Sequence, residues 1–230
     1  MKKIILNHKS YLKYDEIVDF INKFDKLNKD GYEFILFPSI IYLSLFKNKD
    51  YLIGTQNFYS SKEGSFSGEI NLESLKNMGI TYTMIGQYDR IDLLGESITE
   101  IKEKLFKSLK AKFNTILCLG EFRNNKNPFS IIKHELNIYL KSIEKNNIKY
   151  LSILYEPRYI TNNIDCHQLK KLVYRIKTYI KNKYSINIEV YYGGIIQDDK
   201  VNQLLEIFDG IMLNKKSIDI NEIKKIMKKI

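Results

Sequence analysis

Charged side chains follow short apolar runs at several places in this sequence, among them Lys9 and Glu156. A carboxylate at the end of a buried strand can lie in a dry pocket, which raises its pKa toward the range of a general base. A lysine held nearby stabilises negative charge that develops during such a reaction. These residue types permit proton-transfer chemistry. The histidines, cysteines and carboxylates nowhere have the spacing of a metal site, so we expect no metal ion.

The elements that must position these residues are short β-branched or aromatic runs that alternate with amphipathic stretches along the whole chain. The runs typical of strands cover residues 3–6, 33–37, 51–56, 82–86, 115–119, 150–155, 186–192 and 210–213. The stretches typical of helices cover 15–27, a short segment that opens at 38–39, 71–78, 97–110, 128–145, 166–183, 198–207 and 220–229. No linker or low-complexity tract interrupts them, so we expect residues 1–230 to form one domain.

Strands that alternate with helices predict an α/β fold with a parallel sheet. Eight strand-then-helix units without a second change of order favour closure into a (β/α)8 barrel. An open, doubly wound sheet is the alternative that the pattern leaves open. In a barrel of this kind the chemistry lies where strands end and loops begin.

The composition is that of a globular protein, with 44% hydrophobic and 28% charged residues. Lys and Arg number 37 against 27 Asp and Glu, which gives a net charge of +10. The lysines are spread along the amphipathic stretches, so we expect a solvated surface that attracts anionic substrates, with no nucleic-acid partner. Two cysteines give no disulfide framework. The first apolar run is too short for a signal peptide or a membrane span, so we expect a cytoplasmic protein without a membrane partner.

A series of motifs occupies the ends of the expected strands. They are Asn7-His8-Lys9, Gly54-Thr55-Gln56-Asn57, Gly86-Gln87-Tyr88-Asp89-Arg90, Cys118-Leu119-Gly120-Glu121, Tyr155-Glu156-Pro157 and Tyr192-Gly193-Gly194. In order and spacing they resemble the triosephosphate isomerase family, which has Asn-x-Lys, Gly-His-Ser-Glu-Arg, Cys-x-Gly-Glu, Tyr-Glu-Pro and Tyr-Gly-Gly at these places. Each motif alone is weak, but the series covers the chain and implies the family's fold, the TIM barrel.

The resemblance also implies a reaction and the residues that perform it. In this family a carboxylate removes a proton next to a carbonyl, a lysine stabilises the negative charge, and a lid closes over the substrate without a cofactor. By resemblance, Glu156 is the base, Lys9 the electrostatic stabiliser and Asn7 a positioning residue. Four residues stand where the family binds the substrate phosphate: Gly193, Gly194, Asn214 and Lys215.

Several positions depart from the family pattern. Gln87 stands where the family has its catalytic histidine, and an amide can donate a hydrogen bond but cannot exchange a proton near neutral pH. Asp89 is one methylene shorter than the family's glutamate, and Ile195 replaces the serine after Gly-Gly. The family's glycine pair aligns with Asn214-Lys215, and Lys215 and the following Lys216 add bulk and charge there. The lid that begins at Pro157 has no glycine and is shorter than the family's.

Other side chains are expected to serve the fold. We expect Glu121 and Arg90 to form a structural ion pair and Cys118 to be a buried thiol. His8 lies between Asn7 and Lys9 and should point away from them, because side chains alternate along a strand.

We therefore expect an isomerase that interconverts glyceraldehyde 3-phosphate and dihydroxyacetone phosphate in glycolysis and gluconeogenesis, with weakened or altered activity. An isomerase of another phosphorylated sugar and an inactive barrel with a binding or scaffold role are the alternatives. The loop from Gly64 to Ile70, the 64–70 loop, resembles the segment that inserts into a neighbouring subunit of the family. The resemblance implies a homodimer with Ser67 near the partner's site.

Overall fold

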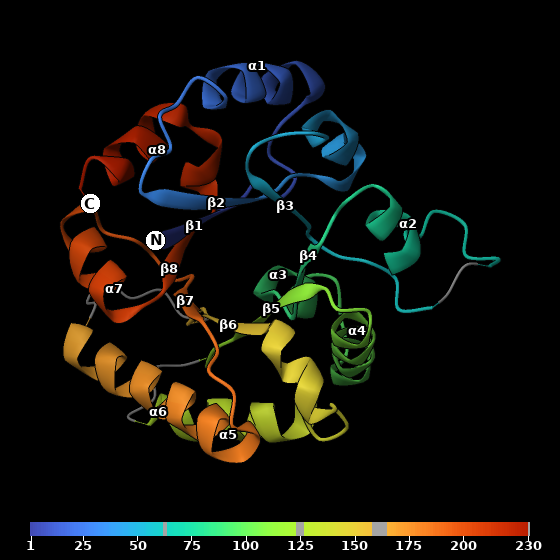
Figure 1. The fold of residues 1–230 in the computed structure, drawn as a ribbon, viewed down its shortest axis with the longest axis vertical. Helices are drawn as coiled ribbons and strands as arrows, with labels where there is room; N and C mark the ends of the chain where they lie inside the picture. Colours follow the sequence, from blue (N-terminus) through green and yellow to red (C-terminus); the bar gives the residue numbers. More distant parts are fainter. Residues whose placement is uncertain (62–63, 123–126, 158–164, 230) are drawn as a thin grey trace.

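A closed barrel of parallel strands forms the centre of the molecule. The computed structural model describes residues 1–61, 64–122, 127–157 and 165–229. Eight strands pair in sequence order, and the first pairs with both the second and the last. Figure 1 shows the helices arranged around the outside of these strands. The closed barrel confirms the (β/α)8 prediction and excludes the open, doubly wound sheet.

The elements follow the predicted alternation. The strands are β1 (Lys2–Asn7), β2 (Tyr32–Phe37), β3 (Leu52–Thr55), β4 (Tyr82–Ile85), β5 (Asn114–Leu119), β6 (Leu151–Tyr155), β7 (Val190–Tyr192) and β8 (Gly210–Leu213). The α-helices are α1 (Tyr14–Phe24), α2 (Leu72–Asn77), α3 (Tyr88–Asp92), α4 (Ile98–Lys110), α5 (Pro128–Tyr139), α6 (Cys166–Tyr184), α7 (Val201–Ile207) and α8 (Ile220–Met227). Short 3-10 helices are η1 (Ile40–Phe46), η2 (Lys145–Tyr150), η3 (Asp198–Lys200) and η4 (Lys215–Ile218).

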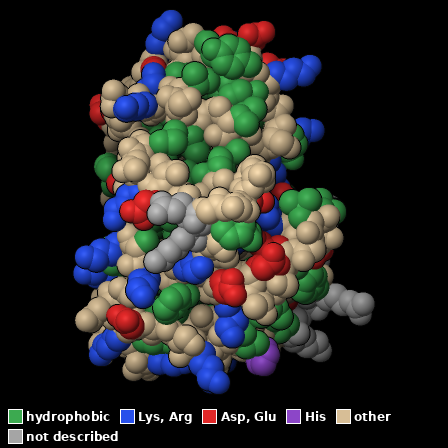
Figure 2. Space-filling model, turned by 90° about the vertical axis from the view of Figure 1, so that its right-hand side faces the viewer, with side chains coloured by type: hydrophobic (Ala, Val, Ile, Leu, Met, Phe, Trp, Pro, Cys, Tyr) green, Lys and Arg blue, Asp and Glu red, His purple; other side chains and the backbone are tan. Residues whose placement is uncertain are grey.

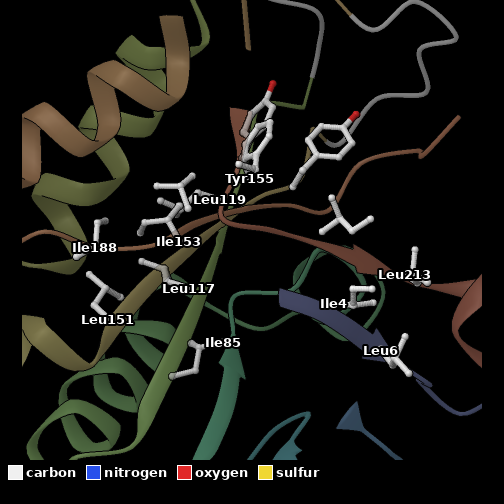
Figure 3. Close-up of a cluster of buried hydrophobic side chains, with 14 of the residues drawn as sticks. Ile4, Leu6, Ile85, Leu117, Leu119, Leu151, Ile153, Tyr155, Ile188 and Leu213 are labelled. Carbon is white, nitrogen blue, oxygen red and sulfur yellow. The ribbon is translucent and has the colours of Figure 1, made fainter. Parts of the chain in front are cut away.

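Two apolar layers hold the barrel together. Successive strand residues point to opposite faces, so each strand supplies both layers. In β6, Leu154 belongs to the group inside the barrel, whereas Ile153 and Tyr155 belong to the larger group between strands and helices. Figure 3 shows part of this outer group, with side chains from β1, β5, β6 and β8. Burial on both faces explains why the strands read as continuous apolar runs.

Local signals set several helix boundaries as predicted. At the start of α4 the Ser97 hydroxyl accepts a hydrogen bond from the Glu100 backbone at 3.2 Å. The Glu100 carboxylate accepts one in return from the Ser97 backbone at 2.8 Å. This reciprocal pair satisfies two of the otherwise unpaired donors at the helix start.

Three elements differ clearly from the sequence-based expectation. The helix expected over 128–145 ends at Tyr139, and η2 follows it, where Ile148 is completely buried. The strand expected over 186–192 is reduced to Val190–Tyr192, and the five-residue helix α3 was not predicted. Apolar periodicity identifies long elements, but where a chain must bend to bury one side chain depends on its neighbours in space.

Candidate active site

The carboxyl ends of the strands surround one mouth of the barrel, and the predicted site residues lie there in two connected groups. The first group comes from the ends of β1, β3 and β4 and consists mainly of amide side chains. The second group lines a pocket beyond β6, β7 and β8 and contains Glu156. Helix α3 connects the two groups, because Gln87 precedes it and Tyr88 is its first residue.

A chain of amide groups links three strand ends in the first group. The Asn7 side chain donates to the Gln87 side-chain oxygen at 3.1 Å. The Gln87 amide nitrogen donates to the Gln56 backbone oxygen at 2.8 Å. Gln87 is only 7% exposed, so both ends of its amide are paired in a nearly dry environment.

Lys9 is held in an uncommon backbone conformation by the same group. Its φ is +47°, a left-handed value that costs a residue with a Cβ about 1 kcal/mol. The Gln56 side chain donates to the Lys9 carbonyl at 2.9 Å, and the Lys9 backbone nitrogen donates to the Asn7 side chain at 3.3 Å. The Lys9 ammonium forms an ion pair with Asp89 at 2.5 Å. The shorter carboxylate at position 89 therefore still reaches the lysine.

Glu156 directly follows β6 and is partly buried beside the end of β5. Its backbone nitrogen donates to Leu119 O at 2.9 Å. A Cβ added to Gly120 would lie 1.9 Å from the Glu156 backbone oxygen, so only glycine permits the close approach of these two strand ends. Gly120 thus sets the place where the Glu156 side chain leaves the barrel.

The pocket of the second group has a volume of about 420 Å³, the size of a small-ligand site. The residues that line it include Tyr88, Glu156, Gly193, Gly194, Ile195, Asn214, Lys215 and Lys216. The structure therefore brings together Glu156 and the four residues expected to bind phosphate. Asn7, Lys9 and Gln87 do not line this pocket. A larger hollow of about 950 Å³ lies between α1 and α8, on the outside of the barrel, and contains none of the predicted site residues.

The two adjacent lysines at the pocket differ in their surroundings. Lys216 forms an ion pair with Asp198 at 2.7 Å and donates to the Ile196 carbonyl at 3.4 Å. Lys215 is exposed, and its ammonium has no ion pair with any residue in the described ranges. Lys215 is consequently the lysine that can turn toward a ligand.

His8 lies outside the site, as expected from strand alternation. It is 1% exposed and packs edge-on against Phe20 with ring centroids 4.5 Å apart. Burial lowers the pKa of His8 to about 4, and an interaction with the Ser217 backbone raises this pKa by a smaller amount. The imidazole is therefore neutral at physiological pH and remote from the pocket.

The expected ion pair between Glu121 and Arg90 is wrong. Arg90 Nε lies 3.2 Å from Glu96, which also pairs with the buried Lys104. Glu121 instead accepts a hydrogen bond from the Tyr155 hydroxyl at 2.9 Å, within the layer between strands and helices. A spacing along the chain does not tell which of several carboxylates an arginine meets. Cys118 is buried as expected, at 3% exposure.

Two residues at the site were not identified from the sequence. Gln56 ties the ends of β1, β2 and β3 together, because its side chain also donates to the Phe37 carbonyl at 2.9 Å. Tyr88 lines the pocket with Glu156. Both stand within motifs at strand ends, and that location was the signal that could have found them. The lid expected after Pro157 lies outside the described residues.

The described part of the chain holds no candidate metal centre. Its histidines, cysteines and carboxylates form no group of three or more that could hold a metal ion. Within the same ranges, every helix is too short or too polar to cross a membrane.

Comparison with known proteins shows which chains this one resembles. The model of the family "Triosephosphate isomerase" matches residues 2–230. A triosephosphate isomerase of Lawsonia intracellularis is 29% identical over 210 residues, which cover 85% of this chain and 83% of that protein. One from Ureaplasma parvum is 28% identical and covers 100% of this chain and 99% of its own, and one from Mycoplasma genitalium is 28% identical over 94% and 93%. The barrel, the residues at its mouth and the match along the chain show that this protein belongs to the triosephosphate isomerase family.

Proposed function

We propose that this protein is an isomerase that interconverts glyceraldehyde 3-phosphate and dihydroxyacetone phosphate. The observation that carries the proposal is the pocket in which Glu156 faces the same space as Gly193, Gly194 and Lys215. The base and the anion-binding groups thus line one pocket, which is large enough for a small ligand. The names of the relatives support the same reaction. Residues 1–230 are proposed to form one barrel domain.

In the proposed reaction, Glu156 takes a proton from the carbon next to the substrate carbonyl. The electron pair of the broken C–H bond moves toward the carbonyl oxygen, which becomes negatively charged. Lys9 lies at the same mouth of the barrel, outside the lining of this pocket, and is held by Asp89 and by the amide groups of Asn7 and Gln56. It is proposed to supply the fixed positive charge that stabilises this oxygen. Glu156 then returns the proton to the neighbouring carbon.

The substrate phosphate is proposed to lie against Gly193, Gly194, Asn214 and the Lys215 side chain. Gly194 also packs closely against a neighbouring side chain, since a Cβ added there would lie 2.6 Å from the Tyr192 hydroxyl. Phosphate sites formed after strands 7 and 8 are common in barrels of this type.

We expect Lys215→Ala to raise the KM for glyceraldehyde 3-phosphate about tenfold and to weaken inorganic phosphate as an inhibitor equally, because one charge-assisted contact is lost. The matched control is Lys216→Ala, whose ammonium is already bound to Asp198. It should change KM by less than about twofold. Equal effects of the two substitutions, measured at several salt concentrations, would show that only the general field of the surface matters.

We expect Gln87→His to raise kcat by ~10-fold or more, because an imidazole assists proton transfer and an amide does not. Gln87 now uses both ends of its amide, toward Asn7 and Gln56. An imidazole that faces the substrate cannot keep both contacts, so the free energy of unfolding should fall by about 1 kcal/mol. Steady-state kinetics and thermal melting measure both effects. A kcat that stays level or falls would indicate a rebuilt site, in which position 87 no longer takes part in proton transfer.

We also propose a homodimer that forms through the 64–70 loop. The loop extends away from the barrel beyond α2, and residues 64–69 are exposed (Figure 1). Figure 2 views the molecule from this side and shows hydrophobic side chains gathered on that face. The exposed large apolar residues of the chain include Phe66 of this loop and Tyr11, Tyr14, Ile41, Leu93 and Leu94. Such side chains favour burial against a second copy.

We expect light scattering to give twice the chain mass of 27.2 kDa at micromolar concentration. Replacing Phe66, which is 41% exposed, with Asp should shift the mass toward the monomer, because a charge would be buried in an interface of obligate size. A wild-type protein that has the monomer mass at these concentrations would contradict the dimer.

The direct test of the proposed function is a coupled assay of isomerisation with the purified protein. Turnover that grows in proportion to protein concentration, and that is lost in a Glu156→Gln sample purified identically, would support it. Equal traces in both samples would come from a contaminating host enzyme and would favour the inactive barrel with a binding or scaffold role. A cytoplasmic location, a role in glycolysis and independence from cofactors stay predictions.

A further inference from the structure

The Gln87 amide is poorly placed to replace the family's histidine as a proton donor. Its oxygen accepts from Asn7, one of its two N–H groups donates to the Gln56 backbone, and the residue is 7% exposed. A primary amide also does not release a proton near neutral pH. Gln87 therefore positions Asn7 and the end of β3, and at most one N–H remains for a ligand.

Tyr88 occupies a different position relative to the pocket. It stands where the family motif has serine, it is the first residue of α3, and it lines the pocket together with Glu156 and Lys215. Gln87 has an extended backbone (φ −61°, ψ 139°) and Tyr88 is helical, so the two neighbouring side chains leave the chain in different directions. Position 87 thus holds a buried amide, and position 88 places a tyrosine at the wall of the pocket.

Other proton-donating side chains near this mouth contact groups outside the pocket or lie at its phosphate side. His8 is buried against Phe20, and Lys216 is bound to Asp198. Lys215 lies on the side of the pocket formed by the end of β8, where the phosphate is proposed to bind. Tyr88 is the tyrosine that lines the pocket together with Glu156 in the described part of the chain.

We infer that the Tyr88 hydroxyl, and not the Gln87 amide, donates the proton to the substrate carbonyl oxygen; this inference rests on the proposed function. A phenol has an ordinary pKa of about 10, so it is protonated at neutral pH and can release its proton to a more basic oxygen. Tyr88 thereby becomes a catalytic residue that the family motif does not contain.

The complete step conserves atoms and electrons. Glu156 takes a proton from C1 of dihydroxyacetone phosphate, the C–H pair forms the C1–C2 double bond, and the C2 carbonyl pair moves to its oxygen. That oxygen takes the Tyr88 proton, which leaves a phenolate and an enediol. The phenolate then removes the proton from the C1 hydroxyl, the new carbonyl forms at C1, and the double-bond pair takes the Glu156 proton at C2.

The test compares the wild type with Tyr88→Phe, which removes one oxygen and keeps the ring. We expect kcat to fall ~10²-fold while KM changes by less than about threefold, because the hydroxyl acts mainly on the developing oxyanion. Affinity for 2-phosphoglycolate, whose carboxylate resembles the enediolate, should fall about tenfold, while affinity for inorganic phosphate stays the same. A side chain that only shapes the pocket would change both affinities together.

A second variant separates the role of the hydroxyl from damage to the fold. Adding Gln87→His to Tyr88→Phe should restore much of the lost kcat, because the imidazole supplies another proton donor. If Tyr88→Phe turns over at nearly the wild-type rate and binds 2-phosphoglycolate equally well, the inference is overturned while the proposed function stands. If the wild type itself has no turnover, the proposed function fails and the inference fails with it.

Discussion

We expect the Glu156→Gln substitution to lower kcat by ~10⁴-fold, with little change in KM or in thermal stability. The two side chains have the same shape, so the pocket that Glu156 lines together with Gly193 and Gly194 keeps its form. The amide cannot take a proton from carbon, and no other carboxylate lines this pocket among the described residues. The effect should therefore be one of chemistry and not of binding.

Glu156→Asp is the matched variant, because it retains the carboxylate and moves it back by one methylene. We expect an intermediate loss of ~10²-fold, which is the usual cost of misplacing a reacting group by about 1 Å. Initial rates with glyceraldehyde 3-phosphate, corrected with protein from an identical mock purification, measure both variants. If the glutamine variant kept a tenth of the wild-type kcat, Glu156 would not be the base.

The stability of the protein is expected to fall by about 3 kcal/mol as the pH decreases from 6.5 to 4, because of His8. In the folded protein the pKa of His8 is about 4, whereas an unfolded chain has the ordinary value near 6.5. Below pH 6.5 the unfolded state binds a proton that the folded state excludes. The loss begins at that pH and is complete once the pH is below 4.

The variant His8→Phe isolates this contribution, since carboxylates elsewhere also titrate in the same range. Phenylalanine keeps an aromatic ring against Phe20 and has no titratable group. Urea unfolding at pH 7, 6, 5 and 4 gives the free energy of unfolding for both proteins. The difference between them should change by about 3 kcal/mol across this range. A difference that is the same at every pH would show that His8 is hydrated or paired in solution.

The departures from the family pattern are accommodated by neighbouring residues and do not dismantle the site. Asp89 is shorter than the family's glutamate, yet its carboxylate lies 2.5 Å from the Lys9 ammonium. Gln87 fills the histidine position and joins Asn7 to the end of β3 through hydrogen bonds.

Much of this architecture is predictable from residue pattern, because the responsible interactions are local. Apolar runs with both faces buried predicted the strands, and the Ser97–Glu100 pair predicted the start of α4. The motifs at the strand ends predicted that Glu156 and Gly194 would lie at one mouth of the barrel, since all eight strands run in parallel. Alternation along β1 predicted that His8 would point away from Asn7 and Lys9, and it packs on Phe20.

Other features depend on groups that are far apart in the chain and could not be read from it. Arg90 meets Glu96 and not Glu121, and Lys216 meets Asp198 while its neighbour Lys215 stays exposed. Pairing of this kind is decided by which side chains the closed barrel brings within a few ångströms, because charge interactions act over short distances in space and have no preferred sequence separation. The same holds for Tyr88. Its place in a motif is visible in the sequence, but only the tertiary structure brings it to the pocket that Glu156 lines.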